Sequence, residues 1–140
     1  MDLTFSATEV QASSGIAYLS ACLAEQGLQA DRVGDVRIAL AEAVNNIVEH
    51  AYSGVDAADI QVNCRLRKNT LDIEIIDTGQ PMPGIKIPEA KAVSVETARL
   101  DLPEGGFGWF LIRQLTSDVV YEREAGVNRL VLSFDFAEMS

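Results

Sequence analysis

The stretch ALAEAVNNIVEHAY at residues 39–52 predicts the central helix of the fold. Its apolar residues recur at the helical period, as they do when one face of a helix packs into a core. Glu42, Asn46 and His50 follow one another at spacings of four, so their side chains are expected to stack along one face. Buried polar groups need partners. This row of three polar side chains therefore indicates either the solvent-exposed face of an amphipathic helix or a binding site whose ligand supplies the partners.

The sequence on either side predicts the elements around this helix. Residues 9–26 show a second helical pattern, and Asp31 is the expected N-cap of the central helix, which should end near residues 53–54. Alternation of apolar and polar residues predicts strands over residues 3–7, 59–67, 71–77, 119–124 and 129–136. The order of these elements predicts an α+β fold, a two-layer sandwich in which helices cover one face of a mixed or antiparallel sheet.

Residues 78–104 form a long connection that contains all four prolines of the chain. A helical piece around residues 90–100 is the regular structure that its pattern allows. Connections of this length within compact domains are usually functional or mobile. We therefore expect a single domain over residues 1–140 with a mobile lid at about residues 80–105, followed by a short apolar helix.

The composition limits the class of protein. The 140 residues are 48% hydrophobic, enough for one domain with a packed core. The 21 acidic residues outnumber the 11 basic ones and give a net charge of −10, which argues against nucleic acid as a partner. Any phosphate site must therefore rely on backbone amides, a metal ion or a few local cations.

Two further observations concern the location of the protein. The chain does not begin with a basic region followed by an apolar run, and no apolar stretch approaches the length of a membrane span. Cys22 and Cys64 lie far apart, in no metal-binding spacing, and are expected to be buried reduced thiols. We expect a cytoplasmic protein with no membrane partner.

Two glycine-containing motifs stand at the ends of predicted elements. Asp77-Thr78-Gly79 follows a strand, where it forms either a plain turn or an acceptor aimed into a pocket that Gly79 leaves open to a flat ring. Gly105-Gly106-Phe107-Gly108 stands at the start of the last helix, as a hinge or as a cradle for phosphate. This second motif matches neither the dinucleotide pattern GxGxxG after a first strand nor the phosphate loop GxxxxGK(S/T).

In this order the three motifs resemble the nucleotide-binding boxes of the GHKL ATPase superfamily, which includes histidine kinases and gyrase. EAVNNIVEHAY resembles the first box, IDTGQPMP the second and LPEGGFGWFLIRQL the third, and the resemblance spans almost the whole chain. It is closest to the small serine/threonine kinases of the anti-sigma-factor type. Pro81 stands where other members often carry a second glycine. The anti-sigma-factor branch tolerates proline there, so this departure favours that branch.

The resemblance implies roles for the residues of the first box. Glu42 would be the general base, Asn46 the Mg²⁺ ligand and His50 a supporting or packing residue. Asn45 stands beside Asn46 and stays a rival for the metal, with spacing as the argument against it. One amide oxygen suffices for Mg²⁺, because this ion keeps waters and phosphate oxygens in its shell.

The second and third boxes would bind the rest of the nucleotide, so the implied cofactors are ATP and Mg²⁺. Asp77 would accept a hydrogen bond from the adenine amino group, and Gly79 would line the ring. The phosphates would lie against the third box, at Gly105, Gly106, Phe107 and Gly108. Candidates for a cation at the γ-phosphate are Lys86, Lys91, Arg99 and Arg113.

The function implied by the resemblance is that of an ATP-dependent serine/threonine protein kinase acting as a regulatory switch. It would phosphorylate a serine of an anti-sigma-factor antagonist, bind a sigma factor or another regulator, and form a homodimer. His50 is the only histidine and lies inside the first box, which argues against a self-contained histidine autokinase. The main alternative is a non-catalytic, nucleotide-dependent module that sequesters a partner. A third is an ATP hydrolase whose lid motion drives a conformational cycle.

Overall fold

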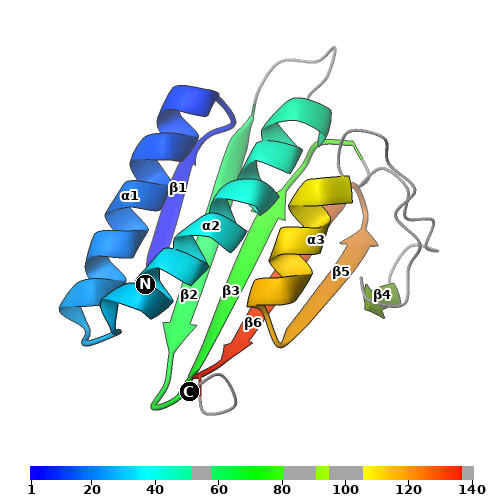
Figure 1. Cartoon of the computed structure of the whole chain (residues 1–140). Helices are drawn as coiled ribbons and strands as arrows, with labels where there is room; N and C mark the ends of the chain where they lie inside the picture. Colours follow the sequence, from blue (N-terminus) through cyan, green and yellow to red (C-terminus); the bar gives the residue numbers. More distant parts are fainter. Residues whose placement is uncertain (52–57, 81–90, 95–105, 137–140) are drawn as a thin grey trace.

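The computed structural model describes residues 1–51, 58–80, 91–94 and 106–136. For residues 50, 51, 91–94 and 106–109 it describes the backbone alone. Within this part of the chain, a six-stranded sheet is covered on one face by helices (Figure 1). Every strand pairing is antiparallel. The predicted α+β two-layer sandwich is therefore confirmed.

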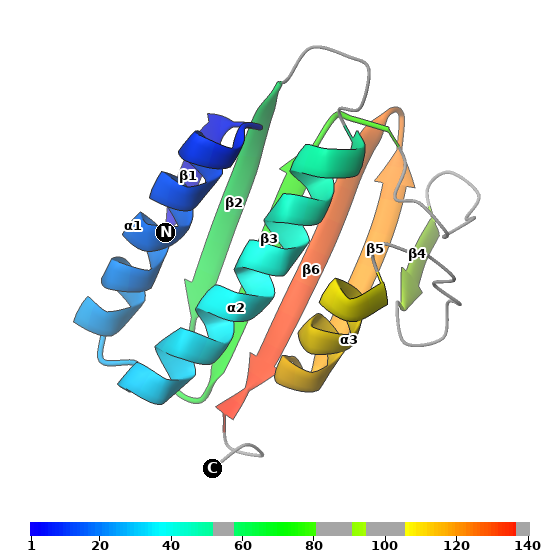
Figure 2. The ribbon, with the colours of Figure 1, turned by 45° about the horizontal axis from the view of Figure 1, so that its top comes forward.

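The sheet has the strand order β1-β2-β3-β6-β5-β4. Its strands are β1 (Asp2–Ser6), β2 (Asp59–Leu66), β3 (Thr70–Asp77), β4 (Lys91–Ser94), β5 (Asp118–Glu124) and β6 (Val127–Asp135). The α-helices are α1 (Glu9–Glu25), α2 (Ala30–Asn46) and α3 (Gly106–Leu115). α2 lies between α1 and α3 in the helical layer and packs against both (Figure 2).

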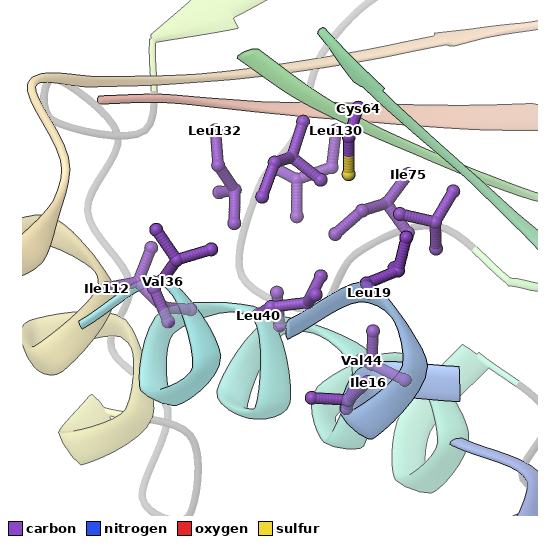
Figure 3. Packing of buried hydrophobic residues seen from close by; sticks show 14 of the residues in the cluster. Ile16, Leu19, Val36, Leu40, Val44, Cys64, Ile75, Ile112, Leu130 and Leu132 are labelled. Atoms are coloured by element: carbon purple, nitrogen blue, oxygen red, sulfur yellow. The ribbon is translucent and has the colours of Figure 1, made fainter. Parts of the chain in front are cut away.

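The hydrophobic core lies between the two layers (Figure 3). Inward-facing positions alternate along β3 and β6, so Ile73, Ile75, Leu130 and Leu132 are buried while the residues between them face the other way. Apolar positions at the helical period cover these strands. The helix residues labelled in Figure 3 are Ile16, Leu19, Val36, Leu40, Val44 and Ile112. The patterns that predicted the elements are therefore the patterns that build the core.

The start of the central helix differs from the prediction. Gln29, not Asp31, is the N-cap of α2, and its side chain makes no capping hydrogen bond. Asp31 lies in the first turn, where its Oδ1 accepts from the backbone N–H of Arg32 at 3.0 Å. A carboxylate in the first turn still favours the helix through the helix dipole. The predicted N-cap was therefore wrong by two residues.

The end of the central helix also differs. α2 ends at Asn46, and a π-helix, η1 (Ile47–Ala51), follows it. The predicted end near residues 53–54 lies outside the described residues. A π-turn is wider than an α-turn, so the regular stacking predicted from Glu42 to His50 is kept only as far as Asn46.

The edge strand β4 is an element that the sequence does not predict. The sequence allows a helical piece around residues 90–100 within a long connection, but residues 91–94 form a strand. This strand pairs with β5 so that Lys91 stands opposite Arg123. Four residues are too few for periodicity to separate a strand from a helix, and the hydrogen bonds of the neighbouring strand decide. The rest of the predicted lid, residues 81–90 and 95–105, lies outside the described residues.

Both cysteines are free thiols, as predicted. Cys64 is buried on β2, and burial raises the pKa of its thiol to about 11. Cys22 on α1 is half-buried. The predicted burial therefore holds fully for Cys64 and in part for Cys22.

The face of the sheet away from the helices carries a chain of polar contacts. Glu74 accepts a hydrogen bond from Asn63 Nδ2 at 2.9 Å and pairs with Arg129, whose Nη1 lies 3.1 Å from Glu122 Oε1. The hydrogen bond from Asn63 and the Arg129 guanidinium lower the pKa of Glu74 below its ordinary value. The stabilisation that these contacts give is therefore fully present when the pH is above the pKa that Glu74 has in the unfolded chain. It is lost as the pH falls through the pKa that Glu74 has in the folded protein.

We expect Glu74→Gln to flatten the acid limb of the stability curve. The free energy of unfolding of the wild-type protein should fall below about pH 4, near the ordinary pKa of a glutamate, because Glu74 is then protonated. The variant carries no carboxylate at this position, so it should not show this loss. Because the ion pair is partly exposed to solvent, the difference should stay under about 1 kcal/mol. Urea unfolding at a series of pH values measures it, with Asp72→Asn on the same strand as the control. An acid limb equal to that of the wild type would contradict this role of Glu74.

Candidate functional site

The three motifs singled out in the sequence lie towards one end of the molecule. The last turn of α2, the end of β3 and the first turn of α3 all lie at that end in Figure 1. α3 packs on the side of α2 opposite to α1 (Figure 2). The fold therefore directs the segments of the three motifs to the same region.

Asp77 is the last residue of β3 and is 3% exposed. Its Oδ2 accepts hydrogen bonds from the backbone N–H of Gly79 at 2.8 Å and from Asn128 Nδ2 at 3.2 Å. Its Oδ1 accepts none from the residues that the structure describes. Burial raises the pKa of Asp77, and the two hydrogen bonds and the charge of Arg123 offset part of that rise. A buried carboxylate with one oxygen held and the other unpartnered is a ready acceptor for a ligand.

Asn128, which holds this carboxylate, is a residue that sequence reasoning missed. It is 4% exposed on β6 and stands opposite Asp77 in the register of the two strands. A signal was present in the sequence. Extending the alternation of Leu130 and Leu132 back by two residues places Asn128 among the buried positions, where a polar side chain needs a partner. The predicted strand begins at Arg129, one residue too late to include it.

Two residues of β5 complete the contacts of Asn128, and sequence reasoning missed them as well. The Tyr121 hydroxyl donates to Asn128 Oδ1 at 2.6 Å, and Arg123 Nη1 donates to the same atom at 2.7 Å. The turn predicted at residues 125–126 is confirmed. Ala125 and Gly126 have φ values of 51° and 79°, the pair of positive angles that a type I′ turn requires. This tight hairpin places Arg123 directly opposite Asn128.

Glu42 and Asn46 lie one turn apart on α2, and both are half-buried. Neither side chain has a hydrogen bond or ion pair with the part of the chain that the structure describes. Asn45 is exposed and lines a groove against α1 together with Arg37 and Ala41. At about 3.6 residues per turn, Glu42 and Asn46 therefore lie on the opposite flank of α2, towards α3. The structure thus separates the two neighbouring asparagines, which the sequence left as rivals.

The glycine motif begins α3, as predicted. Gly106, Phe107 and Gly108 form the first turn, and Gly105 lies outside the described residues. The first backbone N–H groups of a helix have no intrahelical acceptor, and the helix dipole is positive at this end. The start of α3 therefore favours a negatively charged group.

The structure describes less of the other residues that the sequence proposed for the site. His50 lies in η1, where the backbone alone is described. Arg113 is exposed in the last turn of α3, at the end away from the glycines, which argues against contact with an anion at the first turn. Lys91 belongs to β4, and Lys86 and Arg99 lie outside the described residues. Lys91 therefore stays a candidate cation, and Arg113 is disfavoured.

The chain is similar in sequence to known proteins. The family model of the histidine kinase-like ATPase domain matches residues 5–134. The chain is 32% identical over 110 residues to the serine-protein kinase RsbW of Oceanobacillus iheyensis, covering 78% of this chain and 70% of that protein. It is 28% identical over 123 residues to the serine-protein kinase RsbW of Listeria monocytogenes serotype 4a, covering 87% of this chain and 78% of that protein.

A solved structure shares the fold. The crystal structure of the RsbU and RsbW domains of Rv1364c from Mycobacterium tuberculosis matches with a TM-score of 0.63 at 20% sequence identity. The match covers 96% of this chain and 32% of that one, so it bears on the fold alone. The family model spans most of the sequence, and the fold and the relatives agree with it. The chain therefore belongs to the histidine kinase-like ATPase domain family.

Proposed function

We propose that this chain is an ATP-dependent protein kinase that phosphorylates a serine of a partner protein and acts as a regulatory switch of the anti-sigma-factor type. Family membership and the similarity to two serine-protein kinases support the proposal. The observation that carries it is the buried carboxylate of Asp77, whose Oδ1 has no donor among the described residues. Such a group is costly to bury alone, so a ligand that donates to it explains its place.

The amino group of adenine fits this acceptor. Adenine carries an N–H donor at the ring position where guanine carries a carbonyl oxygen, so an unpartnered carboxylate oxygen selects adenine. Gly79 is buried two residues further along and has no side chain to block a flat ring. We assign Asp77 as the acceptor for the base and Gly79 as part of its lining.

Asn46 and the first turn of α3 are the groups that we assign to the phosphate end. The side-chain oxygen of Asn46 is a hard oxygen ligand without a partner in the described structure, and it suits Mg²⁺. When bound, Mg²⁺ would neutralise phosphate charge beside a chain whose own net charge is −10. The backbone amides of Gly106, Phe107 and Gly108, with Gly105 before them, would hold the phosphate oxygens.

Glu42 is the residue to which we assign proton removal. Its carboxylate is half-buried, one turn before Asn46 and on the same flank of α2. It would accept the proton of a serine hydroxyl as that oxygen bonds to the γ-phosphorus and the bond to the β–γ bridging oxygen breaks, releasing ADP. Phosphoryl transfer depends on positioning and charge neutralisation, so few side chains are needed. His50 has a supporting role in this proposal.

The partners are proposed from the family resemblance and the surface. The substrate would be a serine-bearing antagonist protein, and a sigma factor or another regulator would be a further binding partner. A second copy of the chain would cover α1, where Val10 is 73% and Tyr18 is 55% exposed. No charged residue stands between Glu9 and Glu25 of this helix. An apolar, uncharged helix face of this kind favours a homodimer.

A cytoplasmic location is also part of the proposal. The proposed use of ATP and of a regulatory partner of the anti-sigma-factor type supports a location inside the cell. The two free thiols suit a reducing compartment. Of the helices in the described ranges, none has the length and apolar character needed to cross a membrane.

Direct phosphorylation tests the proposal. Purified protein with Mg-ATP and an antagonist-type partner is expected to place phosphate on a serine of that partner. Mg-ADP at about 100 times its Kd should raise the free energy of unfolding by about 2.7 kcal/mol. A partner that binds but receives no phosphate would contradict kinase activity and favour the non-catalytic module. Absence of any thermal shift with millimolar Mg-ATP or Mg-ADP would contradict the nucleotide site itself.

A further inference from the structure

The carboxylate that we assign to adenine belongs to a row of side chains that crosses the sheet. The register places Asp77 of β3 opposite Asn128 of β6, and Asn128 opposite Arg123 of β5. Tyr121 lies two residues before Arg123, so its side chain is on the same face of the sheet. We call Asn128, Tyr121 and Arg123 the Asn128 clamp.

Both the nitrogen and the oxygen of the Asn128 side-chain amide make hydrogen bonds. Its Nδ2 donates to Asp77 Oδ2 at 3.2 Å, to the carbonyl of Gly79 at 3.2 Å and to the carbonyl of Gln80 at 3.0 Å. Its Oδ1 accepts from the two residues of β5. A guanidinium can only donate and a carbonyl can only accept, so the two ends of this amide cannot exchange places. The guanidinium of Arg123 therefore sets the direction in which Asn128 donates.

Arg123 also holds the turn that follows Asp77. Its Nη1 donates to the carbonyl of Gly79 at 3.0 Å, in addition to Asn128 Oδ1. The N–H of Gly79 in turn donates to Asp77 Oδ2. The clamp, the turn and the carboxylate thus form one closed network, in which Oδ2 is held by two donors and Oδ1 stays available.

We propose that Asn128, oriented by Tyr121 and Arg123, is a positioning residue for the nucleotide base: it holds Asp77 Oδ2 and thereby aims Oδ1 at the amino group of adenine. This inference rests on the proposed function. It assigns base selectivity to residues that act through the acceptor: Asn128 contacts Asp77, and Tyr121 and Arg123 contact Asn128. Loss of the clamp lets the carboxylate turn away, which weakens the hydrogen bond to the base and leaves the contacts to the phosphates in place.

Paired titrations with Mg-ADP and Mg-IDP test the positioning role. Inosine diphosphate (IDP) carries an oxygen acceptor where ADP carries the amino donor, so it cannot use Asp77 in this way. Wild-type protein should prefer ADP by roughly 10- to 100-fold, the range for one hydrogen bond to a charged group. Asn128→Ala should reduce this preference to less than about fivefold by weakening ADP binding alone. A purely structural role would weaken both nucleotides equally and leave the ratio unchanged.

Two further variants complete the test. Arg123→Met keeps the aliphatic stem of a half-buried side chain, and it decides the question if Asn128→Ala does not fold. Its preference for ADP over IDP should also fall, because Asn128 loses the donor that orients its amide. Loss of the positive charge alone would weaken both nucleotides alike and leave that preference unchanged. Asn63→Ala is the matched control, since Asn63 is a half-buried asparagine that donates to Glu74 on the outer face of the sheet. Its ratio should equal that of the wild type.

The outcomes separate this inference from the proposal beneath it. A folded Asn128→Ala protein that keeps the wild-type ratio overturns the positioning role, while the nucleotide site stands. The same conclusion follows if ADP and IDP weaken in parallel. Wild-type protein that binds ADP no better than IDP overturns Asp77 as the adenine acceptor, and with it both the site and the clamp.

Discussion

Asp77→Asn is expected to weaken Mg-ADP binding by roughly 30- to 1,000-fold, equivalent to about 2–4 kcal/mol, with the fold intact. The amide oxygen of the new side chain can replace Oδ2 and keep the hydrogen bonds from Gly79 and Asn128. Its NH₂ group then stands where Oδ1 stood, and it meets the adenine amino group donor to donor. The same NH₂ group suits the ring oxygen of IDP. The preference for ADP over IDP should therefore disappear.

The free energy of unfolding of the nucleotide-free protein is the control for this variant. Burial raises the pKa of Asp77, so its ionised form is less favoured in the folded protein than in the unfolded chain. Wild-type protein should therefore lose stability as the pH rises through the raised pKa of Asp77, and Asp77→Asn should not. Equal or higher stability of the variant at neutral pH, combined with lost binding, identifies a ligand effect. Unchanged ADP affinity in the folded variant would show that the base binds elsewhere.

The central helix shows what sequence periodicity can predict. The apolar stripe of residues 39–52 predicted a helix with one buried face, and Leu40 and Val44 of α2 are indeed in the core. The change to a π-helix at residue 47 has no counterpart in that stripe, because the same apolar residues fit either kind of turn. The choice between Asn45 and Asn46 also needed the structure. It depends on which flank of α2 packs beside α1, and that is a property of tertiary packing.

The candidate site likewise contains some residues that the sequence predicts and others that only the structure shows. Asp77 and the glycines at the start of α3 could be predicted because each motif stands at the end of a regular element. Asn128 acts on Asp77 across 51 residues of sequence, through the register of β3 and β6. Register follows from how whole strands pair, so no local pattern contains it. The same reason explains why Tyr121 and Arg123 were missed and why β4 was not predicted.

Glu42→Gln is expected to lower the rate of phosphoryl transfer by roughly 10²- to 10⁴-fold with little change in Mg-ADP affinity. An amide cannot accept the serine proton, whereas its size and its contacts with neighbours are almost those of the carboxylate. Glu42 has no hydrogen bond or ion pair with the described residues, so the substitution leaves none of them with an unsatisfied partner. Glutamine forms helices about as well as glutamate, so the free energy of unfolding should stay within about 0.5 kcal/mol of the wild type.

Asp35→Asn is the matched control for this variant, because Asp35 is a half-buried acid on the same helix, about two turns earlier. Single-turnover transfer from Mg-ATP to the partner separates the chemical step from binding. Wild-type transfer rates in Glu42→Gln would contradict its role as the base. Partner binding that depends on nucleotide in all three proteins, with no transfer in any of them, would favour the non-catalytic module. A rate lost in Glu42→Gln and kept in Asp35→Asn identifies Glu42 as the base, because both changes neutralise one acid on α2 and differ only in the position of that acid.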